Sequence, residues 1–126
     1  MKKIILLITL VSSMLFAQSA EEIVDTNGCL ACHAVAGKKT APAFAGIAKK
    51  NKRFDATNAK NNIIDGIKNG SKGKFRRFAD AEMPAYPHLS ADELNLVADY
   101  ILSQSSKARG RGGNGGGQGS RMGMNQ

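Results

Sequence analysis

The chain's only two cysteines stand three positions apart and are followed at once by a histidine, in the run Cys29-Leu30-Ala31-Cys32-His33. This Cys-x-x-Cys-His spacing is the attachment signature of c-type haem. One turn of helix separates the two thiols, so both sulfur atoms can form thioethers with vinyl groups on one edge of the porphyrin. The next residue, His33, is then carried under the iron, where its ring nitrogen can serve as the proximal ligand. The motif therefore predicts one covalently bound haem c per chain, around which the polypeptide has to fold.

Three other uses of the same residues have to be weighed against haem attachment. Cys29 and Cys32 could form a structural disulfide, which an oxidising compartment would favour. They could be a thioredoxin-like redox pair, but that fold needs strands around the motif, and the sequence gives no sign of them. A zinc site would need further ligands, and among histidines and cysteines only His88 remains. The histidine next to Cys32 and the helical pattern of the chain favour haem over all three.

The motif leaves the second axial position of the iron open, and Met83 is the candidate for it. Met83 stands before Pro84 in a loop that precedes the last predicted helix, and a residue before proline is biased away from helical conformation. A thioether held in this way could reach the iron from the side opposite the proximal histidine. His88 competes as a second imidazole, and a lone methionine can also be a flexible core residue. Met122 and Met124 lie in the terminal tail, where ordering a ligand would cost conformational entropy.

Residues 1–19 have the pattern of a secretory signal peptide. Two lysines, at positions 2 and 3, precede a mainly apolar run over residues 4–16, and small residues follow that run. The run is shorter than the ~20 residues needed to span a bilayer, although an uncleaved anchor is the alternative. We expect cleavage between Ala17 and Ala20, and export of the mature protein to a bacterial periplasm.

Composition divides the exported chain into a domain, residues 20–106, and a tail, residues 107–126. The tail holds eight of the 14 glycines, four basic residues and no acidic residue. Because it cannot bury enough apolar surface to order itself, we expect it to be disordered. Its charge would allow weak contact with an anionic membrane surface. We expect no nucleic-acid partner, since an exported protein meets little RNA.

Charge is segregated along the domain. Residues 38–77 contain 12 lysines and arginines against two acidic residues. The flanking segments, residues 18–37 and 78–106, together contain eight acidic residues and no basic one. This pattern predicts a basic surface on one side of the domain that steers negatively charged partners, with an ordinary solvated surface as the alternative.

Apolar residues recur at helical spacing, and they never alternate with period two for long enough to predict a sheet. Ser90 and Glu93 form a capping-box pattern at the start of the clearest helix, which is predicted to end near Ser103. The other predicted helices are residues 20–27, residues 56–69 with Gly70 as a C-cap, and one or two turns within residues 44–50. Together these segments predict an all-α domain with three main helices.

The order of these elements resembles the monohaem class I c-type cytochromes of bacteria. The resemblance covers about residues 20–104. It is carried by Cys29–His33, Ala41–Ile47, Ile67–Phe75, Met83–Tyr86 and the closing helix Leu94–Leu102. It implies the cytochrome c fold, with Met83 as the distal iron ligand and the carbonyl of Pro42 accepting the N–H of His33. It also implies that Tyr100 packs against the first helix.

A cytochrome of this kind is implied to carry single electrons rather than to act on a substrate, because histidine and methionine together saturate the iron. The resemblance implies a quinol-oxidising membrane complex as electron donor and a terminal oxidase or cytochrome c peroxidase as acceptor. We expect a monomer. One alternative is a haem enzyme or sensor with a labile sixth ligand, acting as a peroxidase or binding a gas. Another is an interaction protein in which the haem is structural.

A domain this small has a thin polypeptide core, to which the porphyrin would add an apolar centre. The residues expected to form the walls around it are Phe44, Ile63, Ile67, Phe75, Leu94 and Val97. Many relatives carry tryptophan where this chain has Phe75 or Phe78, so we expect one hydrogen bond to a haem propionate to be missing. The glycine-rich tail is a second departure from the family pattern.

Overall fold

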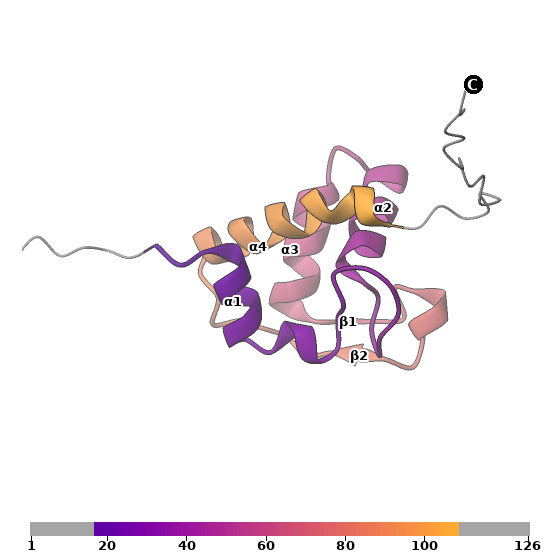
Figure 1. Cartoon of the computed structure of the whole chain (residues 1–126), viewed down its shortest axis with the longest axis horizontal. Helices are drawn as coiled ribbons and strands as arrows, with labels where there is room; N and C mark the ends of the chain where they lie inside the picture. The colour runs from indigo at the N-terminus through magenta and orange to yellow at the C-terminus, as the bar shows by residue number, and fades with distance from the viewer. Residues whose placement is uncertain (1–16, 109–126) are drawn as a thin grey trace, which may run out of the picture.

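The computed structural model describes residues 17–108, which form four α-helices, three 3-10 turns and one short two-stranded ladder (Figure 1). In chain order these are α1 (Ala20–Thr26), η1 (Cys29–Ala31), α2 (Phe44–Phe54), α3 (Ala59–Asn69), β1 (Ser71–Lys72), η2 (Arg76–Phe78), β2 (Glu82–Met83), α4 (Ala91–Ser103) and η3 (Gln104–Lys107). The all-α prediction is confirmed, with four helices where three main helices were expected.

Helix α4 is the element against which the other three helices pack, and in Figure 1 it runs from the α1 side of the molecule to the α2 side. Its start is fixed by the predicted capping box. The Ser90 hydroxyl accepts the N–H of Glu93 at 3.2 Å, and the Glu93 carboxylate accepts the N–H of Ser90 at 2.7 Å. Its buried residues are Leu94, Val97, Ala98 and Ile101, one face of the helix.

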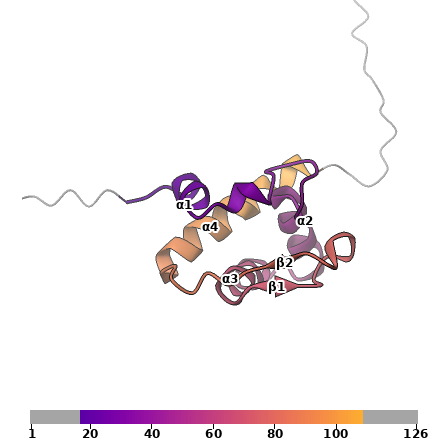
Figure 2. The ribbon, with the colours of Figure 1, turned by 90° about the horizontal axis from the view of Figure 1, so that it is seen from below.

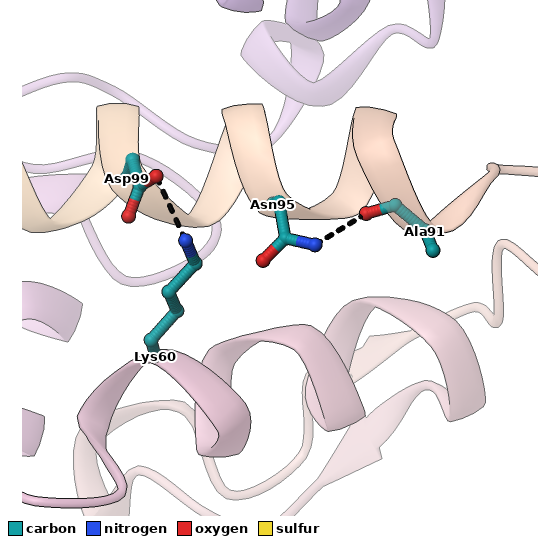
Figure 3. Close-up of polar contacts among 4 residues, drawn as sticks. All are labelled: Lys60, Ala91, Asn95 and Asp99. Carbon is teal, nitrogen blue, oxygen red and sulfur yellow. Dashed lines mark hydrogen bonds and ion pairs between the residues drawn. The ribbon is translucent and has the colours of Figure 1, made fainter.

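Helix α3 lies beside α4, and Ala59, Ile63 and Ile67 of the predicted stripe are buried. The helix begins at Ala59 and not at the predicted residue 56, since Ala56 lies in an exposed turn. It ends at the predicted Gly70. On the solvent side, the Lys60 ammonium pairs with the Asp99 carboxylate of α4 at 2.8 Å (Figure 3). The Asp99 side chain is exposed and the Lys60 side chain is partly exposed, so this ion pair adds little to stability compared with the buried residues beneath it.

Helix α2 is longer than the one or two turns predicted. Its buried residues, Phe44, Ala45 and Ala48, lie in the first half. The second half, residues 49–54, carries four basic residues, which have good helix propensity but bury little and so leave no apolar periodicity to read. The prediction for α1 is confirmed, with Ser19 capping it by accepting the N–H of Glu22 at 3.2 Å.

The ladder between β1 and β2 was not predicted. It is antiparallel and pairs Ser71 with Met83 and Lys72 with Glu82. Two residues per strand are too few to show a period of two in the sequence. Figures 1 and 2 both place the two strands side by side, and Figure 2 shows them next to α3. The ladder joins the segment after α3 to the loop that contains Met83.

The core lies between α4 and the helices packed on it. Its buried members are Ile23, Val24, Phe44, Ala48, Ile63, Ile67, Leu94, Val97, Ala98 and Ile101. Within residues 17–108, no helix is long and apolar enough to cross a membrane. Most of the predicted signal peptide, residues 1–16, and most of the predicted tail, residues 109–126, lie outside the described residues.

Candidate haem site

The cysteine motif begins where α1 ends. Gly28 adopts a positive φ of 69°, which turns the chain into η1. The amides of Cys32 and His33 both donate to the carbonyl of Cys29, at 3.3 and 3.0 Å, so the two cysteines stand one turn apart. Both thiols are free: Cys29 is half-buried and Cys32 is exposed.

Burial raises the pKa of the Cys29 thiol above its ordinary value. A redox-active pair depends on a stabilised thiolate, and burial of Cys29 disfavours the thiolate. The structure therefore offers no support for the thioredoxin-like alternative. Nor does it bring together three histidine, cysteine or acidic side chains as a metal site anywhere in residues 17–108.

The imidazole of His33 is held by one hydrogen bond and one aromatic contact. Its Nδ1 lies 2.6 Å from the carbonyl oxygen of Pro42, and the side chain is buried. A carbonyl can only accept, so Nδ1 carries a proton, and in the neutral imidazole the lone pair is then on Nε2. The ring stacks on Phe44 at 5.4 Å between centroids, with 23° between the planes. His33 thus presents an unprotonated nitrogen in a fixed orientation.

The loop between His33 and α2 returns Pro42 to this position through three backbone hydrogen bonds. The amide of Ala41 donates to the carbonyl of Cys32 at 3.0 Å. The amides of Phe44 and Ala45 donate to the carbonyls of Ala34 and Val35, at 2.9 and 3.0 Å. The start of α2 is therefore tied to the residues that directly follow the motif.

A cavity of about 380 Å³ opens on Cys29, His33 and Met83. Five of the six predicted wall residues line it: Phe44, Ile63, Ile67, Phe75 and Val97. Leu94, the sixth, is not among its lining residues and packs in the helical core instead. The apolar walls and the donor set suit a porphyrin, which needs a dry, broad surface and two axial donors.

A second cavity of about 260 Å³ shares several lining residues with the first. It brings Cys32, which does not line the first cavity, together with Cys29, His33 and Met83. All four residues of the predicted attachment and ligand set therefore line connected or neighbouring space. Tyr86 lines both cavities and had not been singled out as a site residue, because a lone tyrosine in a loop carries no spacing signal.

The structure separates the two candidates for the distal ligand. Met83 is half-buried, lies in β2 and lines both cavities. His88 is exposed and lines neither, and its Nε2 lies 2.8 Å from the side-chain oxygen of Asn27. The placement favours the methionine over the second imidazole.

Comparison with known proteins agrees with this geometry. A family model described as cytochrome c matches residues 17–105. The chain belongs to the cytochrome c family. Membership implies a covalently bound haem c, and the two cysteines that attachment requires are present.

Individual relatives are small bacterial cytochromes. The chain is 34% identical to cytochrome c-551 of Pseudomonas aeruginosa over 97 residues, which are 76% of this chain and 86% of that protein. It is 32% identical to cytochrome c-552 of Nitrosomonas europaea over 88 residues, covering 70% of this chain and 81% of that one. The crystal structure of wild-type Nitrosomonas europaea cytochrome c552 superposes with a TM-score of 0.59 at 31% identity, covering 67% of this chain and 98% of its own.

This cytochrome c has a polar end to its main cavity. The Lys50 ammonium lies 4.1 Å from the centre of the Phe75 ring and donates to the backbone carbonyl of Lys74. The Lys74 ammonium in turn lies 3.6 Å from the Asp65 carboxylate. The placement of the Lys50 ammonium over the Phe75 ring is a cation–π contact. The sequence showed the positive charge of the segment 38–77, but it could not show that Lys50 contacts Phe75.

Tyr100 of α4 was expected to pack against the first helix of the cytochrome. The aromatic contact that the structure records for it is with Phe44, at the start of α2, with ring centroids 6.1 Å apart and an edge-to-face angle of 79°. Since Phe44 also stacks on His33, Tyr100 supports the histidine indirectly. The aromatic series His33, Phe44 and Tyr100 links the proximal side of the site to α4.

Proposed function

We propose that this chain is an exported single-electron carrier with one covalently attached, His/Met-ligated haem c. The observation that carries the proposal is that His33 and Met83 line the same apolar cavity, next to the two cysteines of the attachment motif. Haem c, when bound, supplies an iron centre that can gain or lose one electron. The binding and orientation of the haem are roles of this chain's own residues.

Each site residue has a separate task in this proposal. The thiols of Cys29 and Cys32 are the groups that become thioethers, and Nε2 of His33 is the proximal donor. The hydrogen bond from His33 to Pro42 orients the imidazole and raises its basicity. The thioether sulfur of Met83 is the distal donor. Two side-chain donors leave no axial position for a substrate, so the proposal is for a carrier rather than an enzyme.

Apolar side chains line much of the cavity that His33 and Met83 share. Phe44, Ile63, Ile67 and Val97 are all buried, and they come from three different helices. These apolar walls carry no charge, so they have little cause to rearrange when the haem iron gains or loses an electron. The two donors would therefore stay in place in both oxidation states. That constancy is what a carrier needs, because structural rearrangement slows electron transfer.

The proposed setting is a bacterial periplasm, with the protein acting as a monomer. The leader-like residues 1–19 and the family support export, with cleavage between Ala17 and Ala20. The proposed donor is a quinol-oxidising cytochrome complex, and the proposed acceptor is a terminal oxidase or cytochrome c peroxidase. The four basic residues of the segment 107–126 would add weak contact with an anionic membrane surface.

Optical spectra of the purified mature protein test the proposal. The reduced protein should show the bands of a low-spin c-type haem, and the pigment should stay with the polypeptide through acid–organic extraction. Extractable pigment would rule out covalent attachment. A high-spin spectrum, with rapid carbon monoxide binding by the reduced wild type, would favour a haem enzyme or gas sensor with a labile sixth ligand.

A further inference from the structure

Gly70 allows an unusually close backbone approach. It follows α3 directly and has φ 79° and ψ 171°, a conformation that residues with a side chain rarely adopt. A Cβ atom at this position would lie 2.7 Å from the carbonyl oxygen of Met83, 3.1 Å from the amide nitrogen of Ala85 and 3.3 Å from the carbonyl carbon of Pro84. At the other five glycines within residues 17–108, no heavy atom comes closer than 3.9 Å to such a Cβ.

Two backbone interactions hold the same segment on the end of α3. Ser71, the residue after Gly70, pairs with Met83 in the β1–β2 ladder. The amide of Tyr86 donates to the carbonyl of Ile67, in the last turn of α3, at 2.9 Å. Residues 83–86 are therefore seated against this helix end on both sides of Gly70.

Helix α3 also forms part of the cavity wall, through Ile63 and Ile67. Helix α3 thus forms part of the wall and also supports the backbone that carries the Met83 side chain. The distance between the cavity wall and the Met83 backbone depends on how closely residues 83–85 can approach the end of α3. Because Gly70 has no side chain, they can approach closely.

We propose that Gly70 is a positioning residue for Met83, acting on the distal donor through the backbone of residues 83–85. This inference rests on the proposed role of Met83 as an iron ligand. A Cβ at position 70 would push the Met83 carbonyl from 2.7 Å to the 3.4 Å or more of ordinary contact. This displacement would move the backbone that carries the Met83 side chain, and with it the thioether that would bind the haem iron.

The test compares Gly70→Ala with Gly37→Ala in the haem-loaded protein. Gly37 is the matched control, because its φ of 92° imposes similar backbone strain on an alanine, but nothing lies within 4 Å of the added Cβ. It lines neither cavity. The readouts are the sulfur-to-iron charge-transfer band of the oxidised protein and carbon monoxide binding by the reduced protein. Both report the distal donor, and Gly37→Ala shows what backbone strain alone does to them.

We expect Gly70→Ala to lose most of the charge-transfer band and to bind carbon monoxide, while Gly37→Ala keeps the band and excludes the gas. If both variants keep the band, or both lose it, the inference is overturned. A wild type without the band would instead contradict the proposed role of Met83.

A measurement on the wild type decides the case in which Gly70→Ala does not mature. In the reduced, diamagnetic protein, nuclear Overhauser contacts should connect an α-proton of Gly70 to the amide proton of Ala85. The amide proton of Tyr86 should exchange slowly with solvent. Absence of the Gly70–Ala85 contact would overturn the inference whatever the variant does, and its presence together with failed maturation of Gly70→Ala alone would support it.

Discussion

The Nδ1 atom of His33 donates to the carbonyl oxygen of Pro42 at 2.6 Å, across a loop of nine positions. This bond fixes which ring nitrogen carries the proton and leaves Nε2 free to bind a metal. Phe44, two residues further on, stacks on the same ring. The start of α2 therefore orients the imidazole through both a backbone acceptor and an aromatic contact.

Phe44 and Phe54, at the two ends of α2, should differ sharply when each is replaced by alanine. Phe44 is 3% exposed and contacts both His33 and Tyr100, so Phe44→Ala should destabilise the haem-loaded protein by about 3–5 kcal/mol. Phe54 is 75% exposed, so Phe54→Ala should cost no more than about 0.5 kcal/mol. Urea unfolding followed by circular dichroism measures both, and equal losses would contradict the packing described for α2.

Replacing both cysteines, Cys29→Ala with Cys32→Ala, should abolish covalent haem and leave the chain largely unfolded. The reason is that the helices pack around a large apolar cavity, which must be filled for the domain to be stable. Acid–organic extraction and circular dichroism test the two parts of this prediction. A folded double variant that retained pigment after extraction would show that the motif is not the attachment site.

The capping box of α4 should make stability depend on pH in the acidic range. The backbone and side chain of Ser90 lower the pKa of the Glu93 carboxyl below its ordinary value of 4.5. The stabilisation from the ionised carboxylate is therefore full above pH 4.5, and it is lost as the pH falls through the lowered pKa of the folded state.

Glu93→Gln should therefore be less stable than the wild type at neutral pH, with the difference shrinking at the acidic end. Ser90→Ala removes the other half of the box and should cost about 1 kcal/mol. Thermal unfolding between pH 3 and pH 7 measures both variants. A difference between Glu93→Gln and wild type that did not change with pH would mean that the carboxylate is not the stabilising species.

Association with an acidic redox partner should be steered by the basic segment 38–77. Arg76 and Arg77 lie in η2, between Phe75 and Phe78, which line the main cavity. Reversing both arginines to glutamate should slow association and flatten its dependence on ionic strength, because exposed charges are screened beyond ~8 Å at physiological salt. The haem potential should change little.

The matched control makes the same charge change at Lys52 and Lys60. Their ammonium groups bind Ser105 and Asp99, and neither lysine lines a cavity. Stopped-flow electron transfer across a salt series compares the two double variants. If rates do not depend on salt, the basic segment is an ordinary solvated surface. If both double variants slow equally, the steering comes from the total charge of the segment and not from the arginines beside the cavity.

Local sequence rules predicted the helices whose signals lie within a few residues. The Ser90–Glu93 box and the stripe ending at Gly70 both place their helix ends where the structure has them. The second half of α2 and the β1–β2 ladder could not be predicted in this way. The first shows charged residues with no apolar period, and the second depends on pairing between residues ten or more positions apart.

The same distinction between local sequence signals and long-range contacts applies to the site. The chemistry of Cys29, Cys32 and His33 is contained in five consecutive residues, so spacing alone pointed to it. The placement of Met83 at the end of α3 and the position of Lys50 over Phe75 are tertiary contacts. The sequence shows that Lys50 is charged and that Phe75 and Met83 are apolar. Which residues they contact depends on how the helices pack.

The proposed pairing of His33 with Met83 as haem donors is tested by replacing Met83 and its rival His88 in turn. Met83→Ala and His88→Ala are compared by redox potentiometry and by carbon monoxide binding to the reduced protein. A thioether favours the reduced iron, so Met83→Ala should lower the potential and admit carbon monoxide, while His88→Ala should resemble the wild type. The reverse pattern, with His88→Ala opening the site and Met83→Ala leaving it unchanged, would contradict the account.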